Sequence, residues 1–71
     1  MLTFEIVDAS EIEIHGDAEG LRALANRISQ LLERKLDHDH LMTPSWGGAE
    51  LSEERQNRKA ELVNMVTIHR W

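Results

Sequence analysis

Hydrophobic and polar residues alternate at the start of the chain, which is the pattern of a half-buried β-strand. The turn-forming sequence Asp8-Ala9-Ser10 interrupts this alternation, and it then resumes. The apolar members of the pattern are Leu2, Phe4, Ile6, Ile12 and Ile14. Residues 2–15 therefore predict a β-hairpin with one apolar face directed inward and glutamates on the other face.

An apolar repeat with helical spacing follows the hairpin. Gly16 breaks the strand pattern, and Asp17 is a favourable N-cap residue with Glu19 in the first turn. The apolar stripe consists of Leu21, Leu24, Ile28, Leu31 and Leu32. We expect an amphipathic helix over residues 18–35, with Arg34 and Lys35 at its C-terminal end, where the helix dipole favours cations.

The second half of the chain predicts two more strands separated by a long loop. Residues 38–43 alternate and form a short strand, with His38, His40 and Met42 sharing one of its faces. Residues 44–59 are predicted to be mostly loop, with space for a short helix after Ser52. Residues 62–71 predict a long last strand that carries apolar side chains on both faces.

The element order ββαββ predicts an α+β fold, formed by a single small domain over residues 1–71. If all neighbouring strands are antiparallel, they make a four-stranded sheet of order 2-1-3-4 with one long helix on one face. The other face is then left for water, for a partner or for a second copy. A chain of this size buries only about 60% of its unfolded surface, so association would help to stabilise it.

The distribution of charge bears on function more than the net charge of −5 does. Residues 1–21 contain no Lys or Arg, whereas the rest of the chain is nearly balanced. The acids of this first part are Glu5, Asp8, Glu11, Glu13, Asp17 and Glu19. Nucleic-acid binding needs a basic stripe and is therefore disfavoured, whereas an acidic surface suits a basic protein partner. The chain has no cysteine, signal peptide or membrane span, so we expect a cytoplasmic protein.

Histidines on the third strand raise the alternative of a metal site. His38 and His40 lie at i and i+2 on one strand face, and His69 on the last strand could reach the same face. A further ligand is not evident, and no metalloenzyme signature surrounds these residues. A metal-binding protein or enzyme built on this cluster is therefore the weaker alternative, and we expect no cofactor.

Other residue patterns give little support to catalysis. Glu11 and Glu13 resemble an acid–base pair, but an exposed hairpin lacks the pocket that would separate their pKa values. Ser45 and Ser52 have no activating neighbour in the sequence. We therefore assign no catalytic residue and do not expect an enzyme. The tripeptide Trp46-Gly47-Gly48 is different, because tryptophan next to a tight turn is favoured in small cores and at interfaces alike.

Two longer stretches carry a resemblance to a known family. They are Glu13-Ile14-His15-Gly16-Asp17-Ala18-Glu19-Gly20-Leu21 and His38-Asp39-His40-Leu41-Met42-Thr43-Pro44-Ser45-Trp46-Gly47-Gly48, with Glu50-Leu51-Ser52 after them. Over nearly its whole length the chain resembles the immunity protein 32 family of bacterial polymorphic toxin systems. The resemblance implies an antitoxin-like protein that is encoded beside a toxin and inhibits it stoichiometrically.

The resulting hypothesis is a protein that binds and neutralises a cognate toxin. Many toxins of such systems are nucleases with basic clefts, which the acidic hairpin could enter as a phosphate mimic. The candidate partner-binding residues are Glu5, Glu11, Glu13, His40, Trp46, Gly47 and Gly48. A homodimer through the open sheet face or the last strand is a further expectation, compatible with this role.

Overall fold

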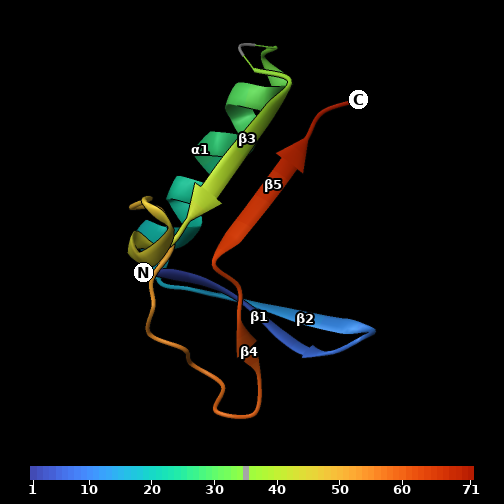
Figure 1. Cartoon of the computed structure of the whole chain (residues 1–71). Coiled ribbons are helices and arrows are strands. Elements are labelled where there is room, and N and C mark those ends of the chain that lie inside the picture. The colour runs from blue at the N-terminus through green and yellow to red at the C-terminus, as the bar shows by residue number, and fades with distance from the viewer. Residues whose placement is uncertain (35) are drawn as a thin grey trace.

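The α+β class predicted from the sequence is confirmed by a computed structural model, which describes residues 1–34 and 36–71 (Figure 1). Lys35, the predicted last residue of the helix, lies outside the described residues. The elements are β1 (Leu2–Asp8), β2 (Glu11–Gly16), α1 (Ala18–Leu32), β3 (His38–Met42), the 3₁₀ turn η1 (Pro44–Trp46), β4 (Glu61–Leu62) and β5 (Met65–His69).

The strands form two antiparallel sheets in place of the predicted single one. β1 lies between β2 and β4, and β3 pairs with β5. The predicted strand order 2-1-3-4 is therefore wrong. The reason lies in the last strand, which changes partner within two residues. The Val63 N–H donates to Phe4 O (2.9 Å), whereas Asn64 O accepts from the Thr43 N–H (3.0 Å).

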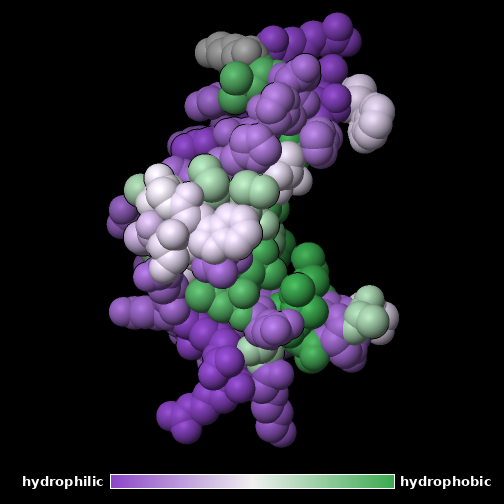
Figure 2. All heavy atoms as spheres, viewed as in Figure 1, coloured by the Kyte–Doolittle hydropathy of each residue, from purple (hydrophilic) through white to green (hydrophobic). Residues whose placement is uncertain are grey.

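The hairpin has the predicted apolar face, but only its inner half is buried. Leu2 and Phe4 are 1% and 7% exposed. The outer residues of the same face, Ile6, Ile12 and Ile14, keep 40–60% of their surface exposed. Figure 2 shows hydrophobic residues gathered in the hollow between the hairpin and β5. The apolar face therefore continues beyond the core into solvent.

The helix begins as predicted and ends earlier. The Asp17 carboxylate caps it by accepting a hydrogen bond from the Gly20 N–H (2.8 Å). It ends at Leu32 because Arg34 takes a left-handed conformation (φ 60°) that cannot continue an α-helix. α1 packs on β3 (Figure 1) and leaves part of its apolar stripe exposed, at Leu21, Ile28 and Leu32. No helix in the described part of the chain is long and apolar enough to cross a membrane.

The core is small and depends on the long loop. Its buried cluster is Leu2, Phe4, Leu41 and Leu51, with Leu24, Val63, Val66 and Ile68 packed around it. Leu51 comes from the loop, and the next residue, Ser52, donates its N–H to Leu2 O (2.8 Å). The short helix that the sequence allowed after Ser52 does not form. Residues 47–60, all of which are described, contain no helix. The loop is thus a packed part of the fold.

Candidate functional site

Glu5, a predicted binding residue, is completely buried. Its carboxylate accepts hydrogen bonds from the Thr3 hydroxyl (2.5 Å) and from the backbone N–H groups of Gln56 (3.0 Å) and Asn57 (2.8 Å). Burial raises the pKa of Glu5, but these hydrogen bonds together outweigh it and hold the pKa below its ordinary value. Glu5 therefore ties the loop to β1 and offers a partner no surface.

The two remaining hairpin glutamates differ in their surroundings. Glu13 Oε1 accepts from Asn57 Nδ2 (3.0 Å) and lies 2.9 Å from His15 Nε2, and these contacts lower the pKa of Glu13. Glu11 is exposed, and its side chain makes no hydrogen bond or ion pair with the residues that the structure describes. Of the three hairpin glutamates, Glu11 is thus the residue most free to meet a partner.

The turn after β3, residues 43–48, exposes Trp46 to solvent, and we call it the Trp46 turn. Trp46 is 57% exposed although it is the largest side chain of the turn. Its N–H donates to Thr43 O (2.9 Å), and the Gly48 N–H donates to the same oxygen (3.0 Å). Glu53 adds a brace, because its carboxylate accepts from both the N–H (2.8 Å) and the hydroxyl of Ser45. The exposed indole is therefore presented by a well-bonded backbone.

Both glycines after Trp46 have a structural reason to be glycine. Gly47 adopts a φ of 89°, which L side chains rarely take. At Gly48 an added Cβ would lie 2.5 Å from Met42 O, so the turn could not close against β3. They shape the turn that presents Trp46.

The three histidines of the metal hypothesis do gather on the outer face of the β3–β5 pair. The His38 ring lies 5.2 Å from the His40 ring and 5.9 Å from the His69 ring, measured between centroids. Nδ1 of His38 bonds to Asp37 (2.7 Å), and Nδ1 of His40 bonds to Thr67 Oγ1 (2.9 Å). Across residues 1–34 and 36–71, no three potential ligands are arranged to hold a metal ion. The metal-binding alternative therefore gains no support.

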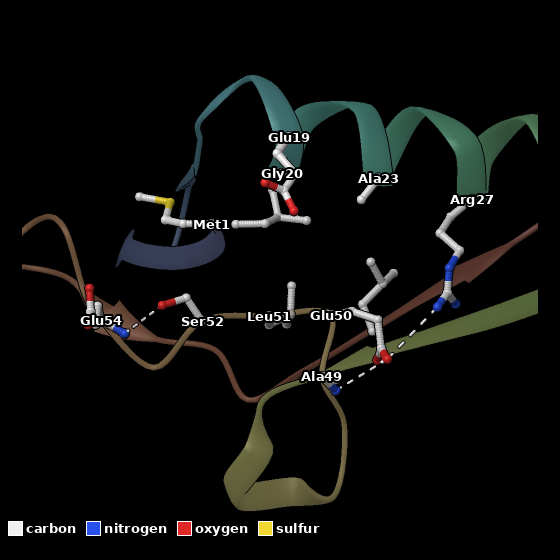
Figure 3. Close-up of a pocket in the computed structure, with 12 residues that line it drawn as sticks. Met1, Glu19, Gly20, Ala23, Arg27, Ala49, Glu50, Leu51, Ser52 and Glu54 are labelled. Carbon is white, nitrogen blue, oxygen red and sulfur yellow. Dashed lines mark hydrogen bonds and ion pairs between the residues drawn. The ribbon is translucent and has the colours of Figure 1, made fainter.

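A pocket of about 480 Å³ lies between α1 and the loop (Figure 3). Its lining combines buried leucines with acidic side chains, namely Leu2, Leu41 and Leu51 with Glu19, Glu50 and Glu54. Arg27 lies on one wall, with Nη1 2.8 Å from Asp39 and Nη2 3.8 Å from Glu50. These carboxylates raise the pKa of Arg27, and the hydrogen bond that Arg27 donates to Asp39 contributes most. We assign no catalytic residue to this pocket.

Glu50 and Glu53 hold the loop against β3 and its following turn, a role that the sequence pattern does not indicate. Glu50 Oε1 accepts from the Met42 N–H (3.0 Å), as Glu53 does from Ser45. Both carboxylates reach back eight residues to β3 or to the turn after it. No periodicity marks such contacts, because they depend on the path of an irregular loop.

The predicted binding residues do not form one cluster. His40 and the Trp46 turn follow one another along β3 and the segment after it, whereas the hairpin tip with Glu11 projects away from them (Figure 1). The face of β3–β5 that carries the histidines is largely hydrophilic (Figure 2). The molecule therefore offers two separate candidate surfaces, the Trp46 turn and the hairpin tip.

Comparison with known proteins identifies the family. A family model described as Immunity protein 32 matches residues 11–69, which span every element from β2 to β5. The chain belongs to this family. Immunity protein 32 is thus confirmed as the family that the sequence resembled, and its description supports an immunity-type, non-enzymatic role. No curated protein and no solved structure matches the chain.

Proposed function

We propose that this member of the Immunity protein 32 family binds a cognate bacterial toxin and neutralises it by stoichiometric protein–protein contact. The observation that carries the proposal is the family match, which includes the whole Trp46 turn and β2 of the hairpin. A preformed surface favours tight binding by an inhibitor of this kind, because ordering a mobile surface would cost binding free energy. The well-bonded turn supplies such a surface.

The Trp46 turn is the principal contact in this proposal. An exposed indole on a rigid backbone loses little conformational entropy on binding and buries a large apolar area. Tryptophan is among the residues most enriched at interface hot spots. His40, which is exposed on β3 shortly before the turn, extends this contact in the proposal.

The acidic hairpin tip supplies long-range attraction to a basic toxin surface, such as the cleft of a nuclease. Charge complementarity raises association rates more than it raises affinity. Because Glu5 is buried and Glu13 is bonded to Asn57, Glu11 is the hairpin glutamate whose charge lies most openly at the surface. Reversing Glu5 would unfold the loop and would not test the surface.

The experiment is co-expression with the product of the adjacent upstream gene, followed by pull-down and a toxicity assay. The wild type should form a complex and protect the cells. Trp46→Ala should weaken binding by about 2 kcal/mol or more, about 30-fold in Kd, as expected for a hot spot. Glu11→Lys should slow association and leave dissociation nearly unchanged.

Trp71→Ala is the matched control, because Trp71 is also a tryptophan and is fully exposed at the far end of β5. It should bind as the wild type does. Equal loss of affinity in the Trp46 and Trp71 variants would show that the turn is not a specific part of the interface. Absence of both complex and protection with the wild type would overturn the proposed function itself.

A further inference from the structure

One edge of β5 carries backbone groups without partners. In an antiparallel pair, successive residues point their N–H and C=O groups alternately toward the partner strand and away from it. The bonds Thr43 N–H to Asn64 O and Arg70 N–H to Asp37 O fix this alternation for the β3–β5 pair. The backbone groups that point away from β3 on β5 are those of Met65, Thr67 and His69. Within the described residues, nothing donates to or accepts from them.

The opposite edge of the same sheet is covered in part. On β3 the outward N–H of Met42 donates to Glu50 (3.0 Å), and Met42 O accepts from the Leu51 N–H (3.1 Å). The outward N–H of His40 donates to the Asp39 side chain (2.9 Å). The loop and two carboxylates thus occupy the outward groups of Met42 and the outward N–H of His40, whereas none of the outward groups of β5 is occupied within the described residues.

The outer edge of β2 is protected in another way. Its strand carries Glu11 and Glu13, and two copies of such a strand would repel each other. The sequence of β5, Met-Val-Thr-Ile-His, contains no Asp, Glu, Lys or Arg. Although the chain as a whole has a net charge of −5, β5 itself can therefore approach β5 of a second copy without repulsion between acidic or basic side chains of the strand.

We propose that β5 pairs with β5 of a second copy of this chain, antiparallel and about a two-fold axis at Thr67. In this register Thr67 faces Thr67 of the second copy and Met65 faces His69. Each of these pairs can exchange both backbone hydrogen bonds, so all the open groups on the edge are satisfied. The two β3–β5 pairs then form one continuous four-stranded sheet, and the isologous contact closes at two chains.

The surroundings of this edge also favour association. Val66 and Ile68 pack on the core but stay only partly buried. Hydrophobic residues also line the hollow between β5 and the hairpin (Figure 2). A strand added to β5 covers part of this apolar surface. Only six hydrophobic residues are buried within the described part of the chain, so the core is small and gains stability from such burial.

The first measurement uses the purified chain without any toxin, so its outcome does not depend on the proposed function. Sedimentation equilibrium should give a concentration-dependent mass that rises to twice 8.2 kDa. Thr67→Pro removes an outward N–H that no ladder bond to β3 uses, and should raise the dimer dissociation constant by at least about 10-fold. Thr67→Ala is the matched control, because both variants lose the bond to His40 Nδ1 but alanine keeps the N–H.

Hydrogen exchange by NMR on the wild type gives a second measurement that does not depend on a variant folding. The amides of Met65, Thr67 and His69 should be protected at high concentration and exchange faster on dilution. A wild type that stays monomeric, or a dimer that persists in Thr67→Pro, would overturn the proposal. If the three amides become protected only when the toxin is added, the edge serves the toxin and the dimer is excluded.

Discussion

At the scale of single residues, the largest surprise is Glu5. An alternating strand pattern places it on the polar face of a hairpin, where a glutamate is ordinarily solvated. The structure covers that face with the loop, and backbone N–H groups more than fifty residues away bind the carboxylate. The local sequence gives no sign of such a long-range contact. The alternation therefore predicts correctly that Glu5 lies on the polar face of the hairpin, but predicts wrongly that it is exposed.

Glu5→Gln should therefore destabilise the fold by about 1–3 kcal/mol, because an amide cannot accept all of these hydrogen bonds in a buried site. The pKa of Glu5 is lower in the folded chain than in the unfolded chain. Its ionised form thus stabilises the protein above the ordinary glutamate pKa, and this contribution is lost as the pH falls through the folded value.

Urea unfolding at pH 7 and at acidic pH measures both effects. Glu5→Gln should lose stability at pH 7 and show a weaker dependence on pH in the acidic range than the wild type. The exposed Glu11→Gln is the control and should match the wild type. Equal stability of the two variants at pH 7 would show that Glu5 does not anchor the loop.

At the scale of elements, local patterns predicted the helix start, both hairpin strands and β3, because capping and alternation act over a few residues. The division of the last strand was not predictable in this way. Val63 and Asn64 continue the apolar and polar pattern, yet Val63 bonds to β1 and Asn64 bonds to Thr43, directly after β3. Tertiary packing decides with which strand each of these residues pairs, and the sequence of a single strand does not contain that information.

The turn after β3 gives a prediction at this scale. Gly47→Ala should cost about 1–2 kcal/mol, because its φ of 89° is left-handed and an added Cβ meets no neighbour. Gly48→Ala should cost more, because its Cβ would meet the Met42 backbone. Thermal unfolding of the two variants measures the difference. A larger loss in Gly47→Ala than in Gly48→Ala would contradict the packing described for the turn.

At the scale of the whole molecule, the family and the α+β class followed from sequence, whereas the arrangement of the candidate surfaces did not. The Trp46 turn could be singled out because an aromatic followed by two glycines is unusual, and the structure shows it exposed. Its separation from the acidic hairpin depends on two sheets in place of one (Figure 1). We therefore propose the turn as the contact surface and the hairpin as the source of long-range attraction.

A titration of purified toxin with this protein tests whether neutralisation is stoichiometric. Toxin activity should fall linearly with added protein and vanish at one chain per toxin molecule, without dependence on incubation time once the complex has formed. Inactivation of the toxin by much less than one equivalent, growing with time, would instead show an enzyme. Full toxin activity in the presence of excess protein would contradict the immunity role.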